Sequence, residues 1–125
     1  VIADKGDAAG AVKAFDDVAA DNAVPDPLRD VARLRAGYLL VDSGSYDDVA
    51  QRVETLSADG NPMRSSAREA LGLAAWKAER FDDAVKLFQQ IANDSLAPAN
   101  IRQRANTMLD LMRSAGIKVP DAQST

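Results

Sequence analysis

Cysteine and histidine are both absent from the chain of 125 residues. Without cysteine the protein forms no disulfide and offers no thiolate ligand to a metal ion. Without histidine it lacks the commonest general base, the commonest metal ligand and the side chain that titrates near neutral pH. The sequence also lacks a glycine-rich phosphate loop and a recognisable pair of nucleophile and base. We therefore expect no catalytic residues, no cofactor and no metal site.

Long apolar runs are missing as well. The longest contain a few residues, whereas a membrane-spanning helix needs about 20. The 15 basic and 19 acidic residues are interspersed, so the sequence shows no basic face of the kind that binds nucleic acid. The chain starts at Val1 rather than at methionine, and we expect it to be cut from a longer protein whose targeting signals it does not show.

Aromatic residues are few, while alanine, leucine and charged helix formers dominate the sequence. This composition favours a single all-helical domain over a sheet. Apolar residues at helical spacing predict about six helices. The expected ranges are 7–21, 27–42, 45–58, 62–79, 81–93 and 98–115, preceded by the end of another helix at residues 1–5.

Capping residues mark several of these boundaries. Asp26-Pro27 and Asn61-Pro62 are expected to start helices, each with a polar N-cap followed by proline. Ser45 and Asp48 predict a capping box, and Gly116 is expected to end the last helix. Pairs of adjacent aspartates, at 16–17, 47–48 and 82–83, do not predict a metal site or an acid–base pair, because adjacent helical residues point about 100° apart.

An internal repeat relates two parts of the chain. Gly72 follows Gly37 by 35 residues, and the matching positions around them include Leu28 with Met63 and Tyr46 with Phe81. Glycine inside a helix costs roughly 1 kcal/mol relative to alanine, so we expect another backbone to approach closely at both glycines. In the same frame Phe15 and Phe88 are expected to be buried anchors.

A glycine, a turn and three apolar residues at fixed offsets resemble the tetratricopeptide repeat. The resemblance has departures, because Arg33 and Arg68 occupy the tryptophan position of that family and Leu40 and Ala75 its tyrosine position. It implies antiparallel helical hairpins stacked in a short right-handed solenoid. On this basis residues 1–116 form the repeat domain, and residues 117–125 form a C-terminal tail that is loose from Val119 onward.

A narrower resemblance covers about residues 5–115. It is carried by PLRDVARLRAGYLLVDSGSYDD, by RFDDAVKLFQQI and by APANIRQRA, which look like the tetratricopeptide-like domain of alphaproteobacterial relatives of the ancillary SecYEG translocon subunit. Members of that family carry an N-terminal membrane anchor and display the repeats in the periplasm, near the Sec translocon and envelope chaperones. The resemblance implies the same location and partners here, with membrane attachment only through an anchor that this sequence does not contain.

The resemblance also implies a binding groove, because the first helix of each repeat lines the concave side. The residues expected there are Val31, Leu34, Tyr38, Val41, Asp42, Ser66, Glu69, Leu73, Trp76, Lys77, Arg104, Thr107 and Leu111. Tyr38 and Trp76 are candidate interaction anchors, although each could instead be a core residue. Only Lys77 and Arg104 are basic, so the groove lacks the converging cations that a clamp for a carboxylate would need.

Two functions remain open at this point. The first is a periplasmic module that binds other proteins and belongs to a membrane-anchored chain. The second is a soluble cytoplasmic adaptor or regulator whose repeats bind a peptide. Both make the chain a scaffold for protein partners rather than an enzyme.

Overall fold

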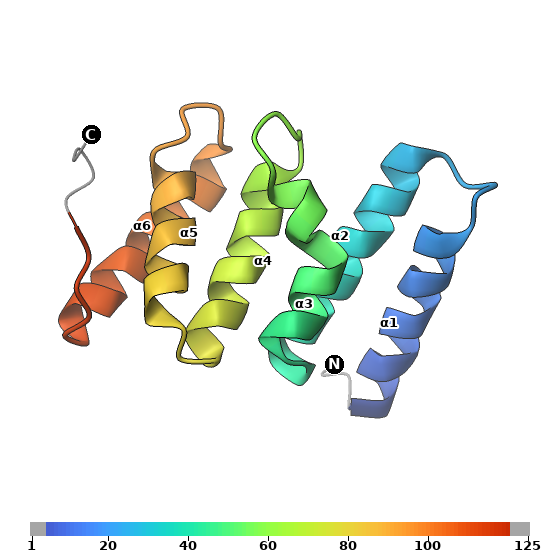
Figure 1. The fold of residues 1–125 in the computed structure, drawn as a ribbon, viewed down its shortest axis with the longest axis horizontal. Coiled ribbons are helices and arrows are strands. Elements are labelled where there is room, and N and C mark those ends of the chain that lie inside the picture. Colours follow the sequence, from blue (N-terminus) through green and yellow to red (C-terminus); the bar gives the residue numbers. More distant parts are fainter. Residues whose placement is uncertain (1–4, 121–125) are drawn as a thin grey trace.

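The computed structural model describes residues 5–120, and this part of the chain is helical without any strand (Figure 1). The predicted all-α fold class is thereby confirmed. The helices are α1 (Lys5–Ala20), α2 (Asp26–Ser43), α3 (Tyr46–Val53), the 3₁₀ helix η1 (Glu54–Ser57), α4 (Arg64–Lys77), α5 (Phe81–Ala92) and α6 (Ala99–Ser114). The helix end predicted at residues 1–5 lies outside the described residues except for Lys5, which belongs to α1.

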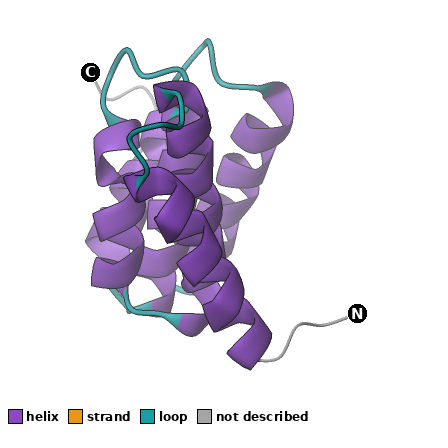
Figure 2. Cartoon of the chain, turned by 90° about the vertical axis from the view of Figure 1, so that its right-hand side faces the viewer, coloured by secondary structure: helices purple, strands orange, loops and turns teal. Residues whose placement is uncertain are grey.

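Successive helices pack against one another as hairpins. Contacts join each helix to the next, and further contacts join α2 to α4 and α4 to α6. The helices form a row in which α1 and α6 lie at opposite ends (Figure 1). Seen from the α1 side, the loops gather at the two ends of the helices, as expected of antiparallel neighbours (Figure 2). Helices α2, α4 and α6 are therefore neighbours although they are not consecutive.

The two repeated glycines occupy equivalent places in this packing. A Cβ atom at Gly37 would overlap Cγ1 of Val53, and a Cβ atom at Gly72 would lie 2.8 Å from Cζ of Phe88. Val53 and Phe88 are themselves 35 residues apart, so the repeat read from the sequence also relates contacts in space. The close approach predicted at the glycines is confirmed, but a side chain of the following helix makes it rather than a backbone.

Buried apolar side chains form two clusters, one joining α2 and α3 to α4 and one joining α4, α5 and α6. Phe88 is 1% exposed and belongs to the second cluster, as predicted. The prediction was wrong for Phe15, which is only half-buried, and the neighbouring Val18 is 39% exposed. The reason is that α1 packs chiefly on α2, through a side that includes the buried Val12 and Ala19.

The start of α3 agrees with the sequence, whereas its end does not. Ser45 Oγ accepts a hydrogen bond from the Asp48 N–H at 3.1 Å, and the Asp48 carboxylate accepts one from the Ser45 N–H at 3.0 Å. This confirms the predicted capping box. The α-helix does not continue to residue 58, because it tightens into η1 after Val53. There the Ser57 hydroxyl donates to the Glu54 carbonyl at 2.6 Å, a local bond that competes with the helical pattern.

The predicted N-caps of α2 and α4 were wrong by one to two residues. Pro25 is the N-cap of α2 and Asp26 is its first residue, while Met63 is the N-cap of α4. Neither cap makes a side-chain hydrogen bond to the helix. Asn61 accepts a hydrogen bond from the Met63 N–H at 2.8 Å, and thus forms a turn before the helix instead of capping it.

Helices α4 and α6 end with the same backbone geometry. The N–H of Arg80 and the N–H of Ile117 each donate to the carbonyl five residues earlier, at 2.8 and 2.9 Å. This is the Schellman motif, in which the turning residue needs a positive φ. Gly116 supplies it after α6, as predicted, with a φ of 86°. After α4 the turning residue is Glu79, with a φ of 60°, so a side chain occupies a conformation that favours glycine.

The segment after α6 packs on the body of the protein. Ile117 and Val119 lie against the cluster of α4, α5 and α6, and the Gln89 amide of α5 donates to the Pro120 carbonyl at 2.8 Å. The tail predicted as loose from Val119 onward is therefore held as far as Pro120. Residues 121–125 lie outside the described part of the chain.

Candidate functional site

The residues predicted to line a groove all lie on α2, α4 and α6. We call the surface that they form the even-helix face. It comprises Val31, Leu34, Tyr38, Val41 and Asp42 of α2, Ser66, Glu69, Leu73, Trp76 and Lys77 of α4, and Arg104, Thr107 and Leu111 of α6. Helical spacing places them in one stripe on each helix, and the contacts between these helices bring the stripes side by side.

A polar bridge crosses the even-helix face and joins the helices. The Tyr38 hydroxyl of α2 donates to Glu69 Oε1 of α4 at 2.7 Å. Arg104 of α6 donates to the same carboxylate from Nε at 2.7 Å and from Nη2 at 3.0 Å. Glu69 is only 6% exposed, and both of its carboxylate oxygens accept hydrogen bonds. The buried charge is therefore compensated, which is the condition under which a buried carboxylate is stable.

The electrostatics of the bridge keep each group in the state that the hydrogen bonds require. Burial raises the pKa of the Tyr38 hydroxyl well above its ordinary value, and the hydrogen bond to Glu69 raises it further. Tyr38 therefore keeps its proton and remains a donor. The hydrogen bonds to Glu69 likewise raise the pKa of Arg104, so the guanidinium stays charged. The bridge acts as a fixed strut between α2, α4 and α6.

A cleft of about 320 Å³ opens beside the bridge, between α4 and α6. Glu69, Leu73, Arg104, Thr107 and Met108 line it, and the sequence had predicted all of these for the face except Met108. Met108 lies one helical turn after Arg104, so the same periodicity could have included it. Leu73 and Met108 are partly buried apolar side chains, and the cleft thus offers an apolar wall beside a satisfied ion pair.

Leu111 and the aromatic residues of the face differ in how free they are. Leu111 is 54% exposed, which is unusual for a leucine on a helix of this core. The Trp76 ring packs edge-on against the Phe81 ring, with centroids 5.3 Å apart. Trp76 and Tyr38 pack against different core clusters, so each has an internal packing role. The structure does not bring them together as the pair of anchors that the sequence suggested.

The remaining predicted residues divide between surface and core. Asp42 and Lys77 are exposed, and the Lys77 amine donates to the Asp42 carbonyl at 3.2 Å. Val41 is 9% exposed and belongs to the core cluster of α2, α3 and α4, so it is not accessible to a partner. Three other residues, Val31, Leu34 and Ser66, are half-buried.

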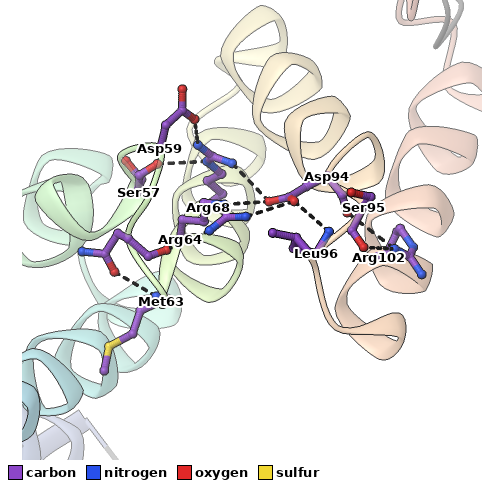
Figure 3. A network of polar contacts seen from close by, with 10 residues as sticks. Ser57, Asp59, Met63, Arg64, Arg68, Asp94, Ser95, Leu96 and Arg102 are labelled. Atoms are coloured by element: carbon purple, nitrogen blue, oxygen red, sulfur yellow. Dashed lines mark hydrogen bonds and ion pairs between the residues drawn. The ribbon is translucent and has the colours of Figure 1, made fainter.

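A second polar cluster lies at the loop end of the helices (Figure 3). Arg64 donates to both oxygens of Asp94 at 2.7 and 3.1 Å. Arg68 is 6% exposed and donates to Asp59 at 2.7 Å and to the Ser57 carbonyl at 3.0 Å. These contacts tie the start of α4 to the loop before it and to the loop between α5 and α6. Because every charged group of the cluster has a partner, the neighbouring cleft of about 570 Å³ is explained by structure alone.

Arginines at equivalent places also bind the ends of preceding helices. Arg29 of α2 donates to the Ala19 carbonyl near the end of α1 at 2.8 Å, as Arg68 of α4 does to Ser57 at the end of η1. A cation is favoured there by the helix dipole. The sequence had predicted ion pairs between helices for these arginines, and for Arg29 the partner on the neighbouring helix is a backbone carbonyl.

Within residues 5–120 no group of acidic side chains could hold a metal ion, and no helix is both long and apolar enough to cross a membrane. No family model, curated protein or solved structure matches the chain. The resemblance to tetratricopeptide proteins of the Sec system therefore stays a prediction.

Proposed function

We propose that the chain is a non-enzymatic module that binds a segment of another protein on the even-helix face. The observation that carries this proposal is the cleft between α4 and α6, with apolar Leu73 and Met108 on its wall and Leu111 exposed on the same helix. An apolar recess beside an exposed apolar side chain is what an interaction surface needs at its centre.

The polar bridge supports the same interpretation. Tyr38, Glu69 and Arg104 satisfy one another's hydrogen bonds across α2, α4 and α6. The face is therefore held in shape before any partner arrives, and a preorganised surface loses less conformational entropy on binding. A rigid, neutral recess without a nucleophile or a free base suits binding better than catalysis.

The wider setting of this proposal rests on the resemblance described above. We propose that the helical hairpins are tetratricopeptide-like repeats stacked as a short solenoid. The module would then face the periplasm from a chain anchored in the bacterial inner membrane, close to the Sec translocon and envelope chaperones. The alternative is a soluble cytoplasmic adaptor, and fractionation of cells that express the longer protein separates the two, since only the first remains with membranes after a salt wash.

Photo-crosslinking in cells tests the binding proposal. A photoreactive amino acid at Leu111 or at Thr107 lies on the even-helix face and replaces an exposed side chain. Tyr38 and Trp76 are poorer positions because both take part in packing. The matched control is Lys86, an exposed residue of α5. We expect a discrete protein adduct from Leu111 and Thr107 and none from Lys86. Equal adducts at all three positions, or none at any, would refute the proposal.

A further inference from the structure

The ion pair beside the cleft carries no net charge, and this limits what the cleft can recognise. The Glu69 carboxylate already accepts hydrogen bonds from Tyr38 and twice from Arg104. A carboxylate of a ligand would therefore meet an arginine whose charge is already compensated. A cation of a ligand would meet a carboxylate that is buried and fully bonded. The chemistry favours a ligand group that is polar but uncharged.

Arg104 nevertheless keeps hydrogen-bonding capacity toward the solvent. Its side chain is 55% exposed, and its bonds to Glu69 use Nε and Nη2. Nη1 donates no hydrogen bond within the described part of the chain, and a guanidinium nitrogen of this kind carries two N–H groups. Thr107, on the other side of the cleft, donates its hydroxyl to the Gln103 carbonyl at 3.1 Å. The open donors beside the apolar wall thus belong to Arg104.

We propose that the cleft takes one apolar side chain from the interior of a partner's extended segment. The side chain lies between Leu73 and Met108, and the backbone carbonyl beside it accepts a hydrogen bond from Arg104 Nη1. Binding does not depend on a free chain terminus or on acidic groups of the partner, because the site is neutral. This inference rests on the proposed function and specifies the class of segment that the even-helix face binds.

Methionine methyl groups report on the cleft without any mutation. The chain contains three methionines, Met63, Met108 and Met112. Met108 lines the cleft, Met112 is fully buried in the core, and Met63 is the N-cap of α4 outside the cleft. In protein labelled with carbon-13 at these methyl groups, a ligand in the cleft should shift the Met108 signal and leave the Met63 signal in place. The Met112 signal reports whether the core is intact.

The probes are pools of nine-residue peptides at millimolar concentration, with Leu, Met, Ile, Phe, Ala or Asp fixed at the centre among Ser, Thr and Gly. Each pool is made in two forms, one acetylated and amidated and the other with a free C-terminal carboxylate. We expect pools with Leu, Met, Ile or Phe to shift Met108, the Ala and Asp pools to have little effect, and the two forms to bind within about twofold of each other. A preference for the free acid of tenfold or more, which corresponds to about 1.4 kcal/mol, would overturn the inference.

The variant Glu69→Gln sharpens the test because it removes the compensating charge and leaves a side chain of the same shape. Arg104 then presents a free positive charge, and the variant should prefer the free-acid peptides by about three- to tenfold, in the range of a hydrogen bond to a charged group. An unchanged Met112 signal shows that the variant is folded. Equal binding of both peptide forms by folded Glu69→Gln would contradict the role assigned to the ion pair.

Two further outcomes separate this inference from the proposed function. If no pool shifts Met108 while Leu111 still gives an adduct in cells, the cleft inference fails and the binding proposal stands. If neither signal is found, both fail. A Met108 shift that depends on protein concentration alone would show that the occupant is a second copy of the chain, and this result would also overturn the inference.

Discussion

Alanine substitution at two glycines should change stability in opposite directions. Gly72 of α4 and Gly10 of α1 both lie inside helices, where alanine is favoured over glycine by about 1 kcal/mol. A Cβ at Gly10 meets no atom within 4 Å, so Gly10→Ala should raise the free energy of unfolding by about 0.5–1 kcal/mol. A Cβ at Gly72 would lie 2.8–3.0 Å from three atoms of the Phe88 ring.

The Phe88 ring cannot retreat easily, because it is 1% exposed in the core. Overpacking of this kind costs about 1–3 kcal/mol, which outweighs the helix preference for alanine. We expect Gly72→Ala to lower the free energy of unfolding by up to about 2 kcal/mol and Gly72→Leu to lower it further. The measurement is urea unfolding followed by circular dichroism, with each variant compared with the unmodified chain.

Phe88 identifies the cause of the effect. In a double-mutant cycle, Gly72→Ala and Phe88→Leu should be coupled by about 1 kcal/mol, since the smaller side chain makes room for the new methyl group. The reasoning fails if Gly72→Ala stabilises the protein as much as Gly10→Ala does. It also fails if the two changes in the cycle are additive.

Three other predictions follow from the packing and from one ion pair. Glu79→Gly should stabilise the protein by about 1 kcal/mol in thermal unfolding, because glycine adopts the positive φ of that turn without strain; destabilisation would show that the Glu79 side chain contributes more than the strain costs. Phe88→Ala should cost about 3–5 kcal/mol and Phe15→Ala clearly less, since only the first ring is buried; equal losses in urea unfolding would contradict the burial of the two rings. Hydrogen bonds from Arg64 lower the pKa of Asp94, so the pair stabilises the fold above about pH 4 and this contribution is lost as the pH falls through the lowered value. Asp94→Asn should therefore be less stable at pH 7 and lose less stability on acidification than the unmodified chain does, and parallel pH profiles would disprove this.

The repeat carried most of the fold that the sequence could predict. Gly37 and Gly72 indicated close contacts because glycine in a helix is costly, and Val53 and Phe88 make those contacts. The sequence could not indicate whether a backbone or a side chain would approach, because both require the same small residue. Phe15 was mispredicted since periodicity shows which side of a helix is apolar but does not show how much of that side a neighbour covers.

The candidate site was predictable in its position but not in its chemistry. The spacing along α2, α4 and α6 placed Glu69 and Arg104 on one face, yet nothing in the sequence distinguished a buried, paired carboxylate from an exposed one. The hydrogen bond from Tyr38 to Glu69 joins residues 31 positions apart. It depends on how closely α2 and α4 approach, which local patterns do not determine. Trp76 illustrates the same limit, because its contact with Phe81 turns an apparent surface anchor into a packing residue.

Binding by matched variants is the most direct test of the claim that the even-helix face holds a partner. Once a crosslinked segment is identified, its Kd can be measured by calorimetry for the unmodified chain, for Thr107→Glu at the cleft and for Lys86→Glu on α5. Both replaced residues are exposed, so both variants should fold. The account predicts at least a roughly tenfold weaker Kd for Thr107→Glu, equivalent to about 1.4 kcal/mol, and an unchanged Kd for Lys86→Glu. An unchanged Kd for Thr107→Glu, or equal weakening by both substitutions, would contradict it.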